Sequence, residues 1–267
     1  MKKLIYLFLT VLIVACSSDD SSDNGGNEPS NCDVVYLADN GVTIKACDDA
    51  IVGNTGNING FTYTIISEQQ LRDYIDADYS ELNRLVTSQV TNMAELFRDS
   101  NINQPIGNWD VSNVTNMIGM FSVSSFNQPI GNWDVSNVTN MVEMFRSTSF
   151  NQDISSWDVG NVTDMRWMLS ENDKFDQPIG NWDVSNVTAM GSMFRGGMLR
   201  DSPFNQDISN WDVSSVTGMG YMFNSADAFN QDLSSWSVAN VTDCFNFSSL
   251  TPQWTLPKPN FTNCNPN

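Results

Sequence analysis

The chain has 267 residues, 40% hydrophobic and 11% aromatic, which is enough to bury a core and excludes a disordered acidic polymer. Its formal net charge is −19, with only 12 Lys and Arg, which disfavours nucleic acid and anionic lipid because both are bound by clustered cations. The chain has no His, so the commonest general base and a common metal ligand are missing.

Residues 1–15 have the pattern of a secretory signal peptide. Lys2 and Lys3 precede an apolar run that is too short to span a bilayer. The run ends Ala15-Cys16, which resembles the lipobox of bacterial lipoproteins, where cleavage precedes a lipidated Cys. We therefore expect Cys16 to be the lipid anchor. The alternative interpretation is an ordinary secretory peptide followed by a chance Cys.

Residues 16–31 are rich in Ser, Asp, Asn and Gly and read as a flexible tether. Acidic residues shortly after Cys16 resemble the surface-export signal of Bacteroidetes lipoproteins. These two resemblances imply a protein held by lipid on the bacterial outer membrane and exposed at the cell surface.

Residues 32–81 do not repeat and are expected to form an N-terminal cap. Apolar residues alternate over 42–46 and over 61–65, which predicts two strands, and the segment 53–57 between them is rich in turn formers. Ser67 and Gln70 fit a capping box at the start of a helix. The expected structure is a small β-hairpin followed by one helix.

A block of about 20 residues then recurs along the chain. Residues 126–145 are its first full copy, a near-copy begins at Ile102, and further full copies begin at Phe150, Phe175, Phe204 and Phe229. A tandem period of this length predicts a solenoid, here over residues 82–248 with about six units of 24–29 residues. Repetition of the same groups also argues against an enzyme, because an active site needs one set of unlike groups.

Each block predicts one short strand and one short helix. Phe126 and Ile130 are four residues apart, so they point the same way from an extended segment. Val138, Met141 and Met144 have the spacing of a helical stripe. The expected fold class is an α/β repeat solenoid similar to leucine-rich repeats, with parallel strands on one side and short helices on the other.

Residues 249–267 break the repeat and predict a C-terminal cap. An oxidising compartment allows disulfides among the four remaining cysteines, which can pair in three ways. We favour Cys32–Cys47 and Cys244–Cys264, because the ends of a solenoid are far apart. A four-Cys zinc site is disfavoured by the absence of close Cys spacing.

The repeated segment Trp-Asp-Val-Ser-Asn-Val-Thr-Asn-Met followed by Met-Phe resembles the repeats of BspA-type leucine-rich-repeat surface lipoproteins, over about residues 82–248. The resemblance implies a surface solenoid, and adhesion is a role of some members. The chain departs from the pattern by having few repeats and by Pro105, Pro129 and Pro178 in the expected strand, where Pro cannot donate to a ladder.

Three repeated residue types have both a structural and a functional interpretation. The Trp ladder predicts core, or else a surface that stacks on sugars. The Asp ladder predicts helix caps, or else calcium ligands. The Asn-Gln pairs predict amide ladders between coils, or else a polar recognition face. Their members are Trp109, Trp133, Trp157, Trp182, Trp211 and Trp236; Asp110, Asp134, Asp158, Asp183 and Asp212; and the pairs beginning at Asn127, Asn151, Asn205 and Asn230.

Binding residues are expected where the repeat varies, since binding concentrates on variable positions of a rigid frame. The two residues between the helix methionines change freely and include Arg166, Trp167 and Tyr221. An insertion that breaks the period carries Arg195 and Arg200, and the alternative is that it is a neutral duplication scar.

The expected function is non-catalytic binding of an extracellular protein or glycan by a lipid-anchored surface protein. The alternatives are a carbohydrate-binding protein that uses the aromatic or Asn-Gln ladders, and a structural envelope protein without a ligand. No catalytic residue, metal ligand or cofactor is expected, with calcium at the Asp ladder as the one alternative.

Overall fold

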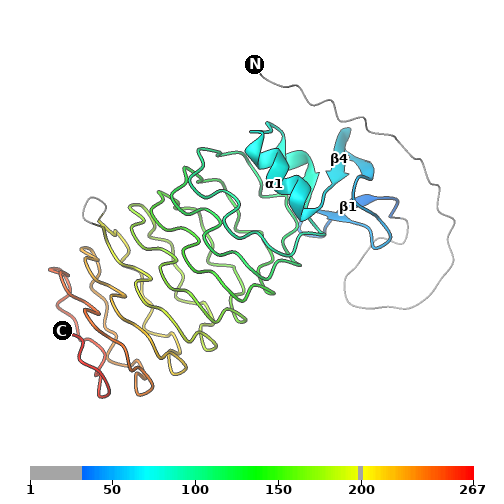
Figure 1. The fold of residues 1–267 in the computed structure, drawn as a ribbon. Helices are drawn as coiled ribbons and strands as arrows, with labels where there is room; N and C mark the ends of the chain where they lie inside the picture. The colour runs from blue at the N-terminus through cyan, green and yellow to red at the C-terminus, as the bar shows by residue number, and fades with distance from the viewer. Residues whose placement is uncertain (1–31, 198–200) are drawn as a thin grey trace, which may run out of the picture.

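The computed structural model describes residues 32–197 and 201–267. They form an elongated stack of coils, closed at its N-terminal end by two small sheets and a helix (Figure 1). The predicted signal peptide, the tether, Cys16 and Arg200 lie outside the described residues. No helix in the described part of the chain is long and apolar enough to cross a membrane.

The N-terminal cap consists of two antiparallel pairs and one added strand. Strand β1 (Val35–Leu37) pairs with β2 (Ile44–Ala46), and β3 (Thr55–Ile58) pairs with β4 (Phe61–Ile65). Strand β5 (Leu85–Val86) follows a single 3-10 turn, η1 (Leu82–Arg84), and joins β4 in parallel.

The predicted hairpin was therefore wrong in its pairing. The strands near 42–46 and 61–65 exist, but each pairs with a partner of its own rather than with the other. The segment that the sequence predicted as a turn contains β3. The prediction missed this strand because its residues do not alternate between apolar and polar, and Thr55 and Asn57 are exposed.

Helix α1 (Glu68–Asp76) starts at the predicted capping box. The Ser67 hydroxyl accepts from the Gln70 amide, and the Gln70 side chain accepts from the Ser67 amide. Leu71 and Ile75 are buried against the first coil. Arg72 donates to the carbonyls of Asn92 and Ala94, so the helix also closes the exposed backbone edge of that coil.

The coils are joined by a backbone ladder in which alternate amides donate forward along the chain. Met117 donates to the Asn140 carbonyl at 3.0 Å, and Gly119 donates to Val142 at 2.7 Å. Phe121 and Val123 continue this row by donating to the carbonyls of Met144 and Arg146. The same four donor positions recur in each following coil up to the last but one. Of the amides between them, the first donates in most coils to a side-chain oxygen two residues back, as Ile118 does to Asn116, and the others bond to the carbonyl three residues back, as Met120 does to Met117. All forward amides therefore point toward the C-terminal end of the stack.

This ladder replaces the short helices that the sequence predicted. In the part of the chain that the structure describes, α1 is the only α-helix, and each block instead forms consecutive turns. Glu143 has φ +57°, which interrupts a helix between Met141 and Met144. Turns with bonds from residue i to i−3 also bring residues three apart to one side, so apolar spacing alone did not separate the two structures.

The predicted strand position was wrong as well. The parallel bridges lie at the expected helix start, where Asn116 pairs with Asn92 and with Asn140. The segment from Phe126 to Ile130 is extended but carries no backbone ladder. Pro129 is tolerated there because the segment has no backbone ladder, so the missing N–H of proline breaks no hydrogen bond.

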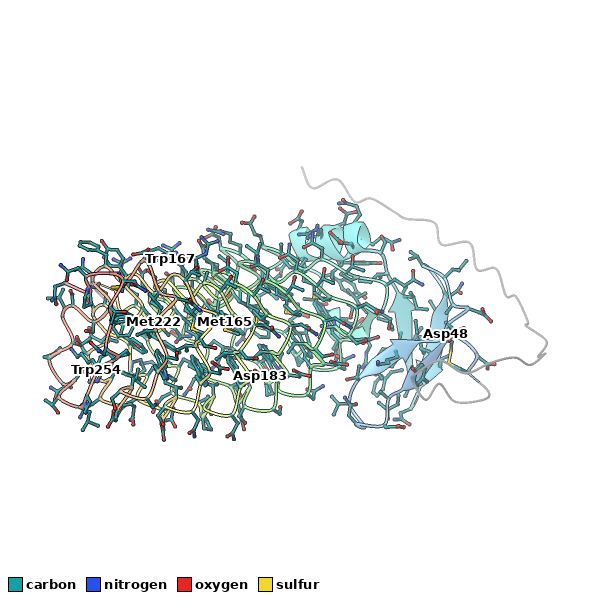
Figure 2. The ribbon with its side chains drawn as sticks, turned by 90° about the horizontal axis from the view of Figure 1, so that it is seen from below. Asp48, Met165, Trp167, Asp183, Met222 and Trp254 are labelled. Carbon is teal, nitrogen blue, oxygen red and sulfur yellow. A yellow bond between two sulfur atoms is a disulfide. The ribbon has the colours of Figure 1, made fainter. Side chains whose placement is uncertain are left out.

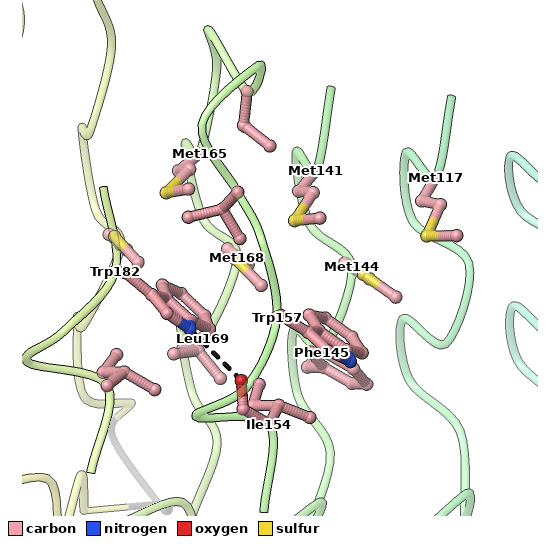
Figure 3. Packing of buried hydrophobic residues seen from close by; sticks show 14 of the residues in the cluster. Met117, Met141, Met144, Phe145, Ile154, Trp157, Met165, Met168, Leu169 and Trp182 are labelled. Carbon is pink, nitrogen blue, oxygen red and sulfur yellow. Dashed lines mark hydrogen bonds between the residues drawn. The ribbon is translucent and has the colours of Figure 1, made fainter. Parts of the chain in front are cut away.

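The interior is a set of stacked columns of like side chains. Met117, Met141 and Met165 lie side by side in successive coils (Figure 3). Phe121 stacks on Phe145 with ring centroids 5.6 Å apart and planes 4° apart. A solenoid buries its core in this way because each coil can cover its apolar face only with its neighbours.

Both favoured disulfides are present, Cys32–Cys47 and Cys244–Cys264. The second joins the last coil to the C-terminal cap, in which Trp254 contacts Phe223, Phe229 and Phe247. Each disulfide thus lies at one end of the stack, where no further coil covers the core.

Candidate binding ridge

Most coils have two backbone positions in the left-handed conformation, and the first of them, called here the left-handed position, is one of the two variable positions. Its φ values lie between +52° and +61°, and its residues are Glu95, Gly119, Glu143, Trp167, Ser192, Tyr221 and Asn246. This conformation is unusual for a bulky residue such as Trp or Tyr. Here the ladder on both sides of each coil imposes it. The large side chains at this position are exposed or half-buried.

Trp167 lies on one long edge of the stack (Figure 2). The Arg146 guanidinium from the preceding coil lies 5.1 Å from the centroid of its ring, and the Arg195 guanidinium from the following coil lies 5.5 Å from it. Both distances are within the range of cation–π attraction. The indole is therefore held between two cations contributed by neighbouring coils.

Ion pairs fix two arginines of this edge, Arg146 and Arg166. Arg166 pairs with Asp164 at 2.6 Å, and that hydrogen bond raises the pKa of Arg166 above its ordinary value. Glu143 bridges Arg98 and Arg146, each at 3.4 Å. The Nε atoms of Arg146 and Arg195 are buried and have no hydrogen-bond partner among the described residues. The edge thus presents alternating charges around one large aromatic ring.

A second aromatic pair lies further toward the C-terminal end. Tyr221 meets Phe245 of the last coil edge-on, with centroids 5.5 Å apart. Both rings are exposed, and Phe245 retains 51% of its accessible surface. We call the surface formed by these side chains the aromatic–arginine ridge, which consists of Arg146, Arg166, Trp167, Arg195, Tyr221 and Phe245.

The structure brings together three of the predicted binding residues, Arg166, Trp167 and Arg195. Tyr221 lies two coils away, and Arg200 lies outside the described residues. Sequence reasoning missed Arg146 and Phe245. An alignment of the blocks carried the signal for Arg146, because Arg98, Arg146 and Arg195 all stand three residues after the left-handed position.

The tryptophan ladder is core, as the first interpretation predicted. The six rings are 0–5% exposed, so their faces are not available to stack on a sugar. Each indole N–H donates to a backbone carbonyl in the preceding coil, as Trp182 does to Ile154 at 3.1 Å (Figure 3). This bond satisfies the one polar group of each buried ring.

The aspartate ladder caps turns rather than helices. The Asp183 carboxylate accepts from the Ser185 amide two residues later, and Asp212 does the same with Ser214. The pKa of both aspartates is lowered mainly by a hydrogen bond from the side chain of the same serine, and next by the bond from its backbone amide. No group of three or more potential metal-ligating side chains occurs within residues 32–197 and 201–267. Calcium binding at this ladder stays a prediction without a supporting cluster.

The Asn-Gln pairs form the predicted amide ladder. The Asn127 side-chain oxygen accepts from the Asn151 amide at 3.0 Å and from the Gln152 side chain at 3.0 Å. The same pattern runs from Asn103 to the cap, where Asn230 accepts from Thr255. The side chains of these Asn and Gln residues therefore connect neighbouring coils by hydrogen bonds.

Comparison with known proteins identified one family. The family described as "Mycoplasma protein of unknown function, DUF285" matches residues 68–171, 122–201 and 146–254, which together extend from α1 to the C-terminal cap. The second and third matches begin 24 residues apart, which is one period of the stack. No curated protein and no solved structure matched the chain.

Proposed function

The chain belongs to the DUF285 family, whose description names no activity, and from its geometry we propose that it binds an extracellular macromolecule through the aromatic–arginine ridge without catalysing a reaction. The observation that supports this most is Trp167, a bulky ring in a left-handed conformation between Arg146 and Arg195. Trp, Tyr and Arg dominate the energetic centres of protein interfaces.

The mode of binding we propose is a rigid frame that presents a few large side chains. The frame is fixed by the ladder, so little conformational freedom would be lost at the backbone when a partner binds. Trp167 and Tyr221 would be the anchors, and Arg166 would pair with an acidic group of the partner. Adhesion to a host protein or to another cell, the role that the resemblance to BspA-type repeats implies, is a more specific form of this proposal.

We also propose that the chain acts outside the cytoplasm, held by a lipid on Cys16. The two disulfides support an oxidising compartment. Placement on an outer membrane, which the sequence suggested, stays a prediction.

The test is a binding screen of the full chain against extracellular proteins and glycans, with calcium and with chelator. We expect saturable binding to a protein, weakened at least about tenfold by Trp167→Ala because truncating an interface anchor costs this much or more. Phe61→Ala is the control, since Phe61 is an exposed aromatic of the N-terminal cap. Its effect should stay below about twofold, as for a residue outside an interface.

Other outcomes of the screen decide against this proposal. A protein partner that binds Trp167→Ala as tightly as the native chain would remove the ridge from the interface. A glycan that binds alone would support the carbohydrate-binding alternative. The absence of any saturable ligand would favour the structural envelope role.

A further inference from the structure

The last coil of the stack has the same backbone as the coils before it. Asn246 and Leu250 have φ +52° and +59°, as their counterparts Gly119 and Val123 do at +56° each. The carbonyls of this coil accept forward bonds from the preceding one, as Phe245 does from Tyr221 at 2.8 Å. The alternate amides of the last coil therefore point out of the C-terminal end.

These outward amides have no acceptor within residues 32–197 and 201–267. In every earlier coil the four equivalent amides donate to the following coil. In the last coil they belong to Cys244, Asn246, Ser248 and Leu250, and no described residue accepts from them. We call the last three the terminal amide row.

The hydrogen bonds of the C-terminal cap lie on a different part of the last coil, while the Cys244–Cys264 disulfide and the Phe247–Phe261 ring contact at 4.9 Å attach the cap beside the row. Pro257 accepts from the Leu233 amide, Trp254 donates to the Gln231 carbonyl, and Asn263 donates to the Ala239 carbonyl. All three bonds lie on the segment before the terminal amide row. At the N-terminal end, by contrast, Arg72 already occupies carbonyls of the first coil. The two ends are therefore unequally closed (Figure 1).

Apolar surface and a hollow accompany the row. Leu250 retains 74% of its accessible surface, and Phe245 borders the row on the side of the ridge. A hollow of about 520 Å³ is lined by Ser248 and Leu250 themselves together with Asp227, Thr251, Pro252 and Lys258. The row thus adjoins exposed apolar side chains and space for a side chain of a partner.

We infer that the terminal amide row binds an extended segment of a partner polypeptide, which adds to the stack through alternate backbone carbonyls as a further coil would. The equivalent amides of each inner coil are covered by the turn segment of the following coil, whose alternate carbonyls accept in bonds of 2.7–3.1 Å. Addition of an extended peptide to an exposed backbone edge is an established way to recognise peptides. Phe245 and Leu250 contact its side chains.

A second copy of this chain does not fit the row. Two terminal rows offer only donors to each other, and at the first coil Arg72 already occupies the carbonyls of Asn92 and Ala94, two of the four equivalent acceptors. The partner is consequently a different polypeptide. This site shares Phe245 with the ridge but does not use Trp167, the anchor of the proposed function.

The test selects linear 12-residue peptides from a display library on the full chain and measures the enriched peptides in solution. Leu250→Asp places a carboxylate beside the amides at an exposed position. Val123→Asp is the matched control. Val123 has the same backbone conformation and is 48% exposed, but its backbone amide already donates to the Arg146 carbonyl. We expect Leu250→Asp to weaken binding at least tenfold and Val123→Asp to change it less than twofold.

Hydrogen exchange supplies the second readout. Binding of an enriched peptide should slow exchange at the amides of Asn246, Ser248 and Leu250. The inference is overturned if no peptide is enriched, if Leu250→Asp binds as well as Val123→Asp, or if these amides are not slowed. A peptide that loses affinity in Trp167→Ala but not in Leu250→Asp belongs to the ridge and also overturns it.

Discussion

At the scale of single residues, the backbone of each block is set by a few positions with strict requirements. Gly131 is one of them, because a Cβ at this position would lie 2.5 Å from the backbone oxygen of Asp153 in the next coil. Gly107 and Gly180 meet the same obstacle at 2.8 and 2.3 Å. These glycines allow close approach of two coils, a role that the repeat pattern did not distinguish from that of a flexible turn.

We predict that Gly131→Ala lowers the free energy of unfolding by about 1–3 kcal/mol, the usual cost of forcing extra volume into a packed site. The obstacle is backbone, so it cannot move aside as a side chain would. Gly218→Ala is the control, because no atom lies within 4 Å of a Cβ built there. Urea unfolding of both variants measures the difference, and equal stabilities would contradict the close approach.

At the scale of the coil, side chains do the bonding that a strand would otherwise do. The extended segment after each Phe has no backbone ladder, and the Asn oxygen of one coil accepts from the amide of the next. Asp176 stands in this column and accepts from the Asn205 amide at 2.9 Å. An acceptor is therefore what the position requires, rather than an amide as such.

We predict that Asn127→Ala costs about 1 kcal/mol, since the Asn151 amide and the Gln152 side chain lose their acceptor. Asn127→Asp should cost clearly less, because a carboxylate oxygen can accept both bonds. Thermal unfolding of the two variants tests the order. If Asp proves as harmful as Ala, the column does not act through its acceptor.

At the scale of the whole molecule, acidic residues determine how stability responds to pH. Five aspartates have a pKa below the ordinary value because they accept hydrogen bonds from the serine two residues later: Asp153, Asp183, Asp207, Asp212 and Asp232. A lowered folded pKa stabilises above the unfolded value near 4, and this stabilisation is lost as pH falls through the folded pKa. Burial first, and then repulsion by Asp201, raises the pKa of Asp227, which opposes the trend at one site.

We therefore predict that the urea midpoint falls between pH 6 and pH 3 when about 0.5 M salt screens the general repulsion among acidic groups. Asp183→Asn supplies the comparison, because its side-chain oxygen can still accept from Ser185 but does not titrate. Its midpoint should fall less over the same interval. A native midpoint that is constant or higher at pH 3 would show that these turns do not control acid stability.

The sequence by itself determined the features that depend on repetition and on local chemistry. The period predicted a stack, large apolar residues at fixed places predicted its core, and the capping box predicted the start of α1. The Asn-Gln ladder and both disulfides followed from the same reasoning, because a solenoid brings like residues together and separates its ends.

Only the tertiary structure decided how the backbone of each coil is bonded. Met141, Met144 and Phe145 have the spacing of a helix, but their amides serve a ladder between coils and turns within one. A helix would use those amides within the coil and leave its neighbours without bonds. The same ladder forces the left-handed position that presents Trp167, and it leaves the terminal amide row without an acceptor. These features depend on contacts between coils 24–29 residues apart, which no local pattern specifies.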